Sequence, residues 1–462
     1  MIGESQRTIV IVGAGYCGTL VAINLLREAA ARPLRVVLVE RGTAVARGVA
    51  YAARDYPYVL NVPASAMSAT SSDPDEFLRY AQQHYPSVRA EDFLPRELYG
   101  DYLDELLRNA AARSRANVEL ALRRDTVVDV ITDHGLAVKF SDGTQMPADD
   151  VVLALGNPPA ANPCRDGTLT TVAGLRPDPW TPLEGADSSK PLLIIGSGLT
   201  MADVVCATLA KTPQRRIYVV SRHGLIPPEQ TSFQRTPIAL GGRRLATATS
   251  VRRLMADTRK LVRELQRLGG DWRTAIATVR HAAPSIWRAL PLTERRRFLR
   301  HVRSYWDIHR HRLPGAVRAR IEALHASGQL RLHAGRIVNV ESSSSGELNV
   351  QWRPRRQSIA LTLRVSEIAN CTGPDYDVRR SADPLLCTLA ARGTLAADEL
   401  GLGLRTGPYG VVIGSRGQTE RRLYYVGPML RSMHWEATAA AELRGHAEAL
   451  ARHLVVQDRR TR

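Results

Sequence analysis

Close to its N-terminus the chain reads Thr8-Ile9-Val10-Ile11-Val12-Gly13-Ala14-Gly15-Tyr16-Cys17-Gly18. The β-branched run of residues 8–12 is typical of a strand that is buried on both faces, and the glycines have G-x-G-x-x-G spacing. Residues 19–31 continue with a helical apolar pattern, and residues 34–39 predict a second strand that ends at Glu40. These segments together predict a βαβ unit, which favours a parallel sheet.

The glycine turn has the properties of a dinucleotide-binding site. Gly13 allows a tight turn, Gly15 lets the backbone approach a pyrophosphate, and Gly18 lets the helix pack on the strand. The N–H groups and the dipole of the helix N-terminus attract phosphate. Glu40 can accept hydrogen bonds from ribose hydroxyls and would repel a 2′-phosphate, so this site, with the adjacent Arg41, predicts FAD or NAD. The alternative is a βα turn without a ligand.

The same architecture starts again near residue 192. A strand at 192–195 leads into Gly196-Ser197-Gly198-Leu199-Thr200-Met201, a helix at 200–209 and a strand at 217–220. The third glycine is replaced by Met201, and the strand ends on Ser221-Arg222 instead of an acid. Because arginine can pair with a 2′-phosphate, this second site predicts NADPH. The alternative is a cofactor-free duplicate with Arg222 on the solvated surface. Two dinucleotide sites imply hydride transfer between two cofactors.

Composition limits the class of protein. The chain has 462 residues, 44% hydrophobic and 23% charged, which excludes wholesale disorder and suggests two to four domains. There is no apolar run long enough for a membrane span, no signal-peptide pattern and no C-x-x-C among the five cysteines, so we expect a cytoplasmic protein. No metal-ligand spacing occurs either.

The net charge of +18 is local. Residues 241–320, which have a helical pattern, hold 20 Arg and Lys against 5 Asp and Glu. Three interpretations stay open: a solvated face at a domain or subunit contact, an anion site for NADPH phosphates or an acidic substrate, and, least favoured, nucleic-acid binding. A helix would place Arg297, His301, Tyr305 and His309 on one face. His301, His309 and Arg312 are our candidate catalytic contacts with substrate or nicotinamide, against a role in helix packing and surface charge.

The remaining segments predict a divided chain. A proline-rich stretch suggests a crossing at 166–189, between a first segment 1–165 and a second nucleotide domain at 190–345 that contains the basic segment. Residues 346–462 follow as the last segment. Thr372-Gly373 and Gly427-Pro428 supply small residues after strands, where a long ligand could run close to the backbone, or they form ordinary turns.

Several further segments carry a resemblance: residues 60–68 (LNVPASAMS), 95–103 (PRELYGDYL), 221–227 (SRHGLIP), 297–301, 306–312 and 370–374, with Gly427-Pro428 and Trp435-Glu436. With the two glycine turns, they make nearly the whole chain resemble flavoproteins with two dinucleotide-binding domains. In particular it resembles a bacterial FAD/NAD(P)-binding family related to amino-acid N-hydroxylases, among them enzymes that oxidise the amine of aspartate.

The resemblance implies an α/β fold with two Rossmann-like domains. It implies that the FAD domain is split by an inserted NAD(P) domain, so that residues 346–462 complete the first domain. It implies that Asn61, Val62, Pro63 and Met67 lie near the flavin, and that Gly427 and Pro428 approach its ring.

The activity that this resemblance implies is an FAD- and NADPH-dependent monooxygenase that hydroxylates a small amine through a flavin hydroperoxide, with molecular oxygen. Two alternatives stay open: a flavin dehydrogenase or reductase without oxygenation, and a nucleotide-sensing module without turnover. An anionic substrate and a homo-oligomer are further options, whereas we expect no membrane partner and no nucleic acid.

Overall fold

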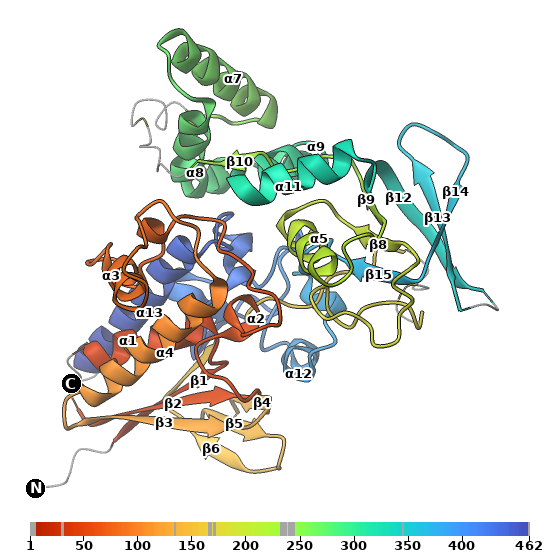
Figure 1. Cartoon of the computed structure of the whole chain (residues 1–462). Helices are drawn as coiled ribbons and strands as arrows, with labels where there is room; N and C mark the ends of the chain where they lie inside the picture. The colour runs from red at the N-terminus through yellow and green to blue at the C-terminus, as the bar shows by residue number, and fades with distance from the viewer. Residues whose placement is uncertain are drawn as a thin grey trace, which may run out of the picture. The chain divides into compact units, whose positions relative to one another are not determined.

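The protein is described by a computed structural model that covers residues 6–28, 32–133, 135–164, 169, 172–231, 238, 245–343 and 346–460. The chain divides into two units, each built on its own largely parallel sheet (Figure 1). Unit 1 comprises residues 1–158, 235–295 and 376–462, and unit 2 comprises residues 159–234 and 296–375. The predicted α/β class with two Rossmann-like sheets is therefore confirmed.

The main sheet of unit 1 has six strands in the order β16-β17-β7-β1-β2-β3. They are β1 (Arg7–Val12), β2 (Leu34–Glu40), β3 (Val118–Arg124), β7 (Asp150–Leu153), β16 (Val411–Ile413) and β17 (Thr419–Tyr425). All neighbours pair in parallel except β16 with β17. β1 lies between β7 and β2, which explains why the chain places a β-branched run there: Ile9 and Ile11 are completely buried.

Helix α1 (Tyr16–Arg27) packs on this sheet, against β1, β2 and β3. The α-helices of unit 1 are α1, α2 (Gly48–Tyr51), α3 (Glu76–His84), α4 (Arg96–Ala112), α7 (Val251–Arg267), α8 (Trp272–Ala289), α12 (Pro384–Arg392) and α13 (Ala440–Arg460). Short 3₁₀ turns are η1 (Ala64–Ala66), η3 (Val378–Arg380), η4 (Pro408–Gly410) and η5 (Pro428–Ser432). α1 packs against both α4 and α13 (Figure 1). A small antiparallel sheet of β4 (Val127–Ile131), β5 (Ala137–Phe140) and β6 (Gln145–Pro147) contacts α12.

Unit 2 repeats the arrangement with the strand order β14-β13-β12-β9-β8-β15. Its strands are β8 (Leu192–Ile195), β9 (Ile217–Ser221), β12 (Leu330–Ser342), β13 (Leu348–Pro354), β14 (Leu361–Val365) and β15 (Glu367–Asn370), with the short pair β10 (Glu229–Gln230) and β11 (Leu313–Pro314). Its helices are α5 (Leu199–Lys211), α10 (Arg303–Arg310), α11 (Gly315–Ala326) and the end of α9 (Leu292–His301). β12 continues into an antiparallel ribbon with β13 and β14.

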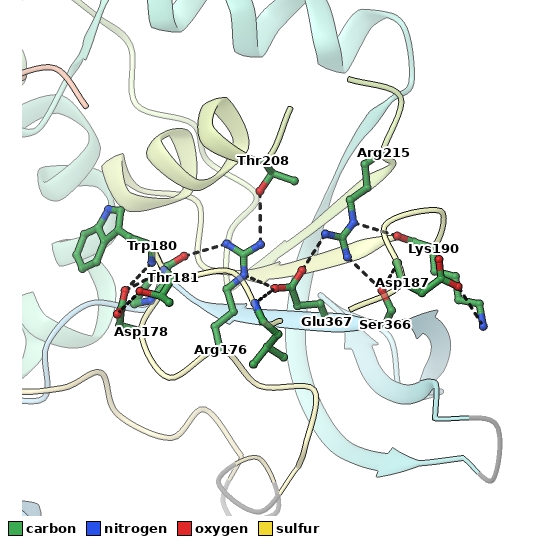
Figure 2. Close-up of polar contacts among 12 residues, drawn as sticks. Arg176, Asp178, Trp180, Thr181, Asp187, Lys190, Thr208, Arg215, Ser366 and Glu367 are labelled. Carbon is green, nitrogen blue, oxygen red and sulfur yellow. Dashed lines mark hydrogen bonds and ion pairs between the residues drawn. The ribbon is translucent and has the colours of Figure 1, made fainter. Parts of the chain in front are cut away.

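A buried carboxylate fastens the proline-rich crossing to this second sheet (Figure 2). Glu367, at the start of β15, is completely buried. Its Oε1 accepts hydrogen bonds from Arg176 Nε at 2.7 Å and from the Leu183 backbone N–H at 2.9 Å. Its Oε2 accepts one from Arg215 at 2.8 Å. Because one carboxylate satisfies two arginines and a backbone N–H, the described part of the crossing belongs to unit 2.

The unit boundaries differ from those that the sequence suggested. Residues 346–375 belong to unit 2 instead of completing the first domain, because β15 pairs with β8 and the β13–β14 ribbon extends β12. The basic segment 241–320 is divided, with its part up to Arg295 in unit 1. Some expected positions, namely Ala31, the boundary at 165–166, the segment start at 241–244 and residue 345, lie outside the described residues. Within the described part of the chain, no helix is long and apolar enough to span a membrane.

Candidate cofactor-binding sites

The first glycine turn is enclosed so tightly that two of its glycines have no room for a side chain. Gly13 has a φ of +103°, and a Cβ there would stand 2.5 Å from the Ala154 carbonyl oxygen. A Cβ on Gly18 would stand 1.9 Å from the Gly13 carbonyl oxygen. The turn therefore requires glycine at both positions because of backbone contacts inside unit 1.

Among the described residues, the first N–H groups of α1 have no side-chain cap beside this turn. The nearest atom to a Cβ built at Gly15 is Gly48 Cα at 3.6 Å. Glu40 stands beside the turn, with Oε2 accepting the Ala14 N–H and Oε1 the Gly42 N–H, both at 2.9 Å. Each carboxylate oxygen keeps a further lone pair for a ligand hydroxyl. Arg41 next to it is exposed and lies 3.8 Å from Asp383.

The residues expected near the flavin also lie in unit 1. Asn61, Val62 and Pro63 precede η1, and Met67, only 3% exposed, follows it. Gly427 follows β17 with a φ of +147°. Since β17, β7 and β1 are parallel neighbours, Gly427-Pro428 and the Gly13 turn lie at the same edge of one sheet.

The first part of the basic segment is anchored on the C-terminal part of unit 1. Trp287 of α8 donates to the Ser432 carbonyl oxygen at 2.9 Å, and its ring lies 4.7 Å from that of Trp435. Arg280 makes a bidentate ion pair with Glu442 of α13, with both hydrogen bonds at 2.7 Å. Residues 251–295 are therefore not part of the second nucleotide domain, where we had placed them.

The second turn has one crowded and one open glycine. A Cβ on Gly196, whose φ is +105°, would stand 2.3 Å from the Cys371 carbonyl oxygen. A Cβ on Gly198 would meet no atom within 4 Å, so the space in front of the start of α5 is open. Met201, in place of the third glycine, is completely buried. Thr372-Gly373 follow β15, which pairs with β8, so these two residues lie beside this turn.

The end of β9 gathers cationic groups. Ser221 Oγ lies 2.9 Å from Ser197 Oγ and accepts the Gly224 N–H at 3.1 Å. Arg222 is next, with its guanidinium 3.5 Å from Ser304 Oγ of α10. Burial lowers the pKa of Arg222, and the charges of Arg303 and Arg336 lower it further, while Asp307 opposes them. Three arginines with a single aspartate among them are typical of a site that binds a multiply charged anion.

His223 extends this group. Burial lowers the pKa of its imidazole, as do Arg355, Arg222 and Arg336, so the ring is neutral near pH 7. Its Nδ1 is a buried atom without a hydrogen-bond partner among the described residues. Sequence reasoning found Arg222 but missed Arg303, Arg336 and Arg355. Strand pairing between distant segments brings Arg336 and Arg355 to β9, and Arg303 comes from α10, so the sequence carried no local signal for these three residues.

The predicted single helical face across residues 297–309 is wrong. α9 ends at His301, and α10 begins at Arg303 after a break at Val302. His301 is exposed, while His309 Nδ1 lies 2.7 Å from the Tyr305 carbonyl oxygen. Arg312 contacts Gln230 Oε1 at 2.5 Å and the His309 carbonyl oxygen at 3.3 Å. Arg312 thus links α10 to β10, and the break separates His301 from His309.

These features define a class of α/β protein with a glycine turn at the edge of each of two Rossmann-like sheets. Residues 10–158 match the model of the FAD-NAD(P)-binding family, and this match lies in unit 1. A search of curated proteins gave no match.

Solved structures resemble the whole chain at low sequence identity. The FAD-bound cadaverine monooxygenase DfoA of Erwinia amylovora has a TM-score of 0.64 at 12% identity, over 98% of this chain and 95% of its own. The reduced ornithine hydroxylase PvdA of Pseudomonas aeruginosa has a TM-score of 0.62 at 14%, over 98% and 100%. A bacillithiol disulfide reductase of Bacillus cereus has a TM-score of 0.53 at 13%, over the same shares. At sequence identities this low, the likeness establishes the fold alone.

Proposed function

We propose that the chain is an FAD- and NADPH-dependent monooxygenase that hydroxylates the nitrogen of a small amine. The observation that carries the two cofactors is the contrast between the two turns of one chain, and the amine substrate is supported by the likeness to the cadaverine and ornithine enzymes. The strand after the first turn ends on an acid, Glu40, and the strand after the second ends on Ser221-Arg222 within a group of arginines. One turn therefore suits a dinucleotide without a 2′-phosphate and the other suits NADPH.

In unit 1 the residues present fit FAD. The N–H groups at the start of α1 would hold the pyrophosphate, and Glu40 would accept a ribose hydroxyl. Residues 61–63, Met67 and Gly427-Pro428 would border the ring system. When bound, FAD supplies the redox chemistry and the reaction with oxygen, while the protein positions the reactants and excludes water.

In unit 2 the open space at Gly198 would admit the NADPH pyrophosphate, and Arg222 with Ser221 would hold the 2′-phosphate. Leu199 and Thr200 supply the first N–H groups of α5, and Thr372-Gly373 border the turn. We keep His301, His309 and Arg312 as proposed contacts of substrate or nicotinamide. Arg312 donates to the His309 backbone carbonyl oxygen at 3.3 Å.

The likeness to a disulfide reductase raises a second candidate, a flavin reductase. A thiol mechanism would need an accessible, activated cysteine pair. All five cysteines lie in the described ranges, and four of them are buried. Burial raises the pKa of Cys17 to about 12, which keeps this thiol protonated and unreactive. The cysteines therefore favour direct chemistry at the flavin.

Anaerobic mixing of the FAD-loaded protein with NADPH or NADH tests this assignment. We expect FAD to stay bound through gel filtration and its visible absorbance to bleach faster with NADPH than with NADH. A protein that retains no FAD, or one that NADH reduces as well as NADPH, would overturn the assignment of the two sites.

A further inference from the structure

Five tyrosines of unit 1 form a continuous row that starts in the first glycine turn. Tyr16 is the first residue of α1, and its ring centroid lies 5.9 Å from that of Tyr51. The next three steps are 4.7 Å from Tyr51 to Tyr99, 5.5 Å from Tyr99 to Tyr102, and 5.3 Å from Tyr102 to Tyr80. We call these five residues the tyrosine row. Four different helices contribute them, so no local sequence pattern explains their meeting.

The row crosses the interior of unit 1: at the turn, Tyr16 and Tyr51 are half-buried, and the other three residues are more deeply buried. Tyr99 is completely buried, Tyr102 is 3% exposed and Tyr80 is 8% exposed. Beyond Tyr80, the exposed His84 lies with its ring 4.4 Å away. Phenol rings are among the most easily oxidised side chains, and electron exchange between aromatic rings in contact is fast. The row therefore joins a cofactor-binding turn to solvent by steps between neighbouring rings.

One member has a proton acceptor built beside it. The Tyr102 hydroxyl donates to Glu76 Oε2 at 2.6 Å and accepts the Ala69 N–H at 3.0 Å. Burial raises the pKa of Tyr102, and the Glu76 charge raises it further, so the phenol stays protonated at neutral pH. A phenol that loses an electron becomes strongly acidic, and a carboxylate already hydrogen-bonded to it can take the proton without any movement of the chain.

We propose that the tyrosine row is a one-electron relay that carries oxidising equivalents from the FAD site of unit 1 to the surface. The inference rests on the proposed function, because a flavin that reacts with oxygen exposes its surroundings to peroxide-derived one-electron oxidants.

The oxidant at the FAD site takes one electron from the turn end of the row, and the vacancy passes to Tyr99, which keeps its hydroxyl proton because that oxygen has no hydrogen-bond partner among the described residues. Tyr102 gives one electron to the oxidised Tyr99 and passes its hydroxyl proton to Glu76. One electron from Tyr80 and the proton returning from Glu76 restore Tyr102, and the Tyr80 hydroxyl proton passes to solvent. A soluble thiol then gives one electron and one proton to Tyr80, and two of the resulting thiyl radicals combine to a disulfide.

The test uses the FAD-loaded full chain, illuminated in frozen solution with hexaamminecobalt(III) as the electron acceptor, and electron paramagnetic resonance as the readout. We expect a tyrosyl radical signal in the wild type that falls severalfold in Tyr102→Phe and in Glu76→Gln. Phe keeps the ring in place but cannot lose the proton, and Gln keeps a hydrogen-bond acceptor but cannot take it. Tyr85→Phe, at an exposed tyrosine outside the row, should leave the signal unchanged.

A second readout locates the damage. After NADPH turnover in air, peptide mass spectrometry should find oxidation at Tyr80 and His84 in the wild type, and at Tyr16, Tyr51 or Cys17 in Tyr102→Phe. If FAD is bound and the radical yield is the same in the wild type and in Tyr102→Phe, the relay is overturned but the proposed function is not. The tyrosine row would then serve only to pack the helices of unit 1. Failure to retain FAD would instead contradict the proposed function and the relay together.

Discussion

Gly196 lies so close to Cys371 that a Cβ on the glycine would stand 2.3 Å from the cysteine carbonyl oxygen, whereas two residues later Gly198 faces open space. We expect Gly196→Ala to destabilise unit 2 by about 1–3 kcal/mol, because backbone atoms must move. Gly198→Ala should leave the urea unfolding midpoint unchanged and weaken NADP⁺ binding, measured by calorimetry. Equal stability of the two variants would contradict the crowding described for Gly196.

The arginine group at the end of β9 predicts how the nucleotide preference changes. Arg222→Ala should reduce kcat/KM for NADPH by about 10- to 100-fold, because a hydrogen bond to a charged group contributes about 1.5–3 kcal/mol. The value for NADH should hardly change, since NADH has no 2′-phosphate. Arg336→Ala should shift the preference in the same direction. Arg216→Ala, on the same unit before β9, serves as the control. An unchanged NADPH-to-NADH ratio in Arg222→Ala would refute the proposed phosphate site.

The buried Arg176–Glu367–Arg215 network predicts a large effect on stability. Glu367→Gln should lower the free energy of unfolding of unit 2 by about 3–5 kcal/mol, because it leaves two buried guanidinium groups without their carboxylate. Glu347→Gln, which weakens the partly exposed pair with Lys190, should cost about 1 kcal/mol or less. Urea unfolding measures the free energy of unfolding of both variants. Similar losses in the two variants would contradict a larger contribution from the buried network than from the exposed pair.

The same carboxylate makes stability depend on pH. Burial raises the pKa of Glu367, but Arg176, the Leu183 N–H and Arg215 lower it more, so its pKa is below the usual value. The folded state thus binds its proton less readily than the unfolded state, whose pKa is about 4.3. Its contribution is complete above that pH and is lost as the pH falls through the lower folded pKa. Glu367→Gln should remove this part of the acid sensitivity in urea titrations.

His446 predicts a second, higher pH range of sensitivity. Burial and then the neighbouring His434 lower the pKa of His446 to about 4, and the two rings lie 4.5 Å apart. An unfolded histidine titrates at about 6.5, so this neutral ring stabilises the fold above that pH, and the stability declines as the pH falls toward 4. NMR titration of His446 should give a depressed pKa, and His446→Gln should flatten the decline. A normal titration at about 6.5 would contradict the described burial.

The elements that the sequence predicted are those governed by local rules. Glycine spacing and the runs at residues 8–12 and 192–195 were enough to place both turns and the strands β1 and β8 that lead into them. Pairing between distant segments was not accessible. The ribbon of β13 and β14 joins unit 2 only because it extends β12, so residues 346–375 were assigned to the wrong unit. Likewise, no proline or glycine marks the break at Val302.

The candidate sites divide in the same way. Glu40 ends β2 and Arg222 directly follows β9, each about 20 residues after a glycine turn, so spacing alone pointed to them. The rest of the arginine group and the tyrosine row are assembled by tertiary packing from residues that are far apart in the chain. Their chemistry becomes visible only when the fold brings the side chains together.

Oxygen consumption by the FAD-loaded protein with NADPH, measured with a panel of amino acids and diamines, tests the proposed function most directly. We expect one amine to increase oxygen uptake, to lower the peroxide released per NADPH, and to gain one oxygen atom on nitrogen by mass spectrometry. The contradicting result has two parts: with every amine, all the oxygen consumed is recovered as peroxide, and a disulfide or quinone acceptor accelerates NADPH oxidation. The protein would then be a reductase and not a monooxygenase.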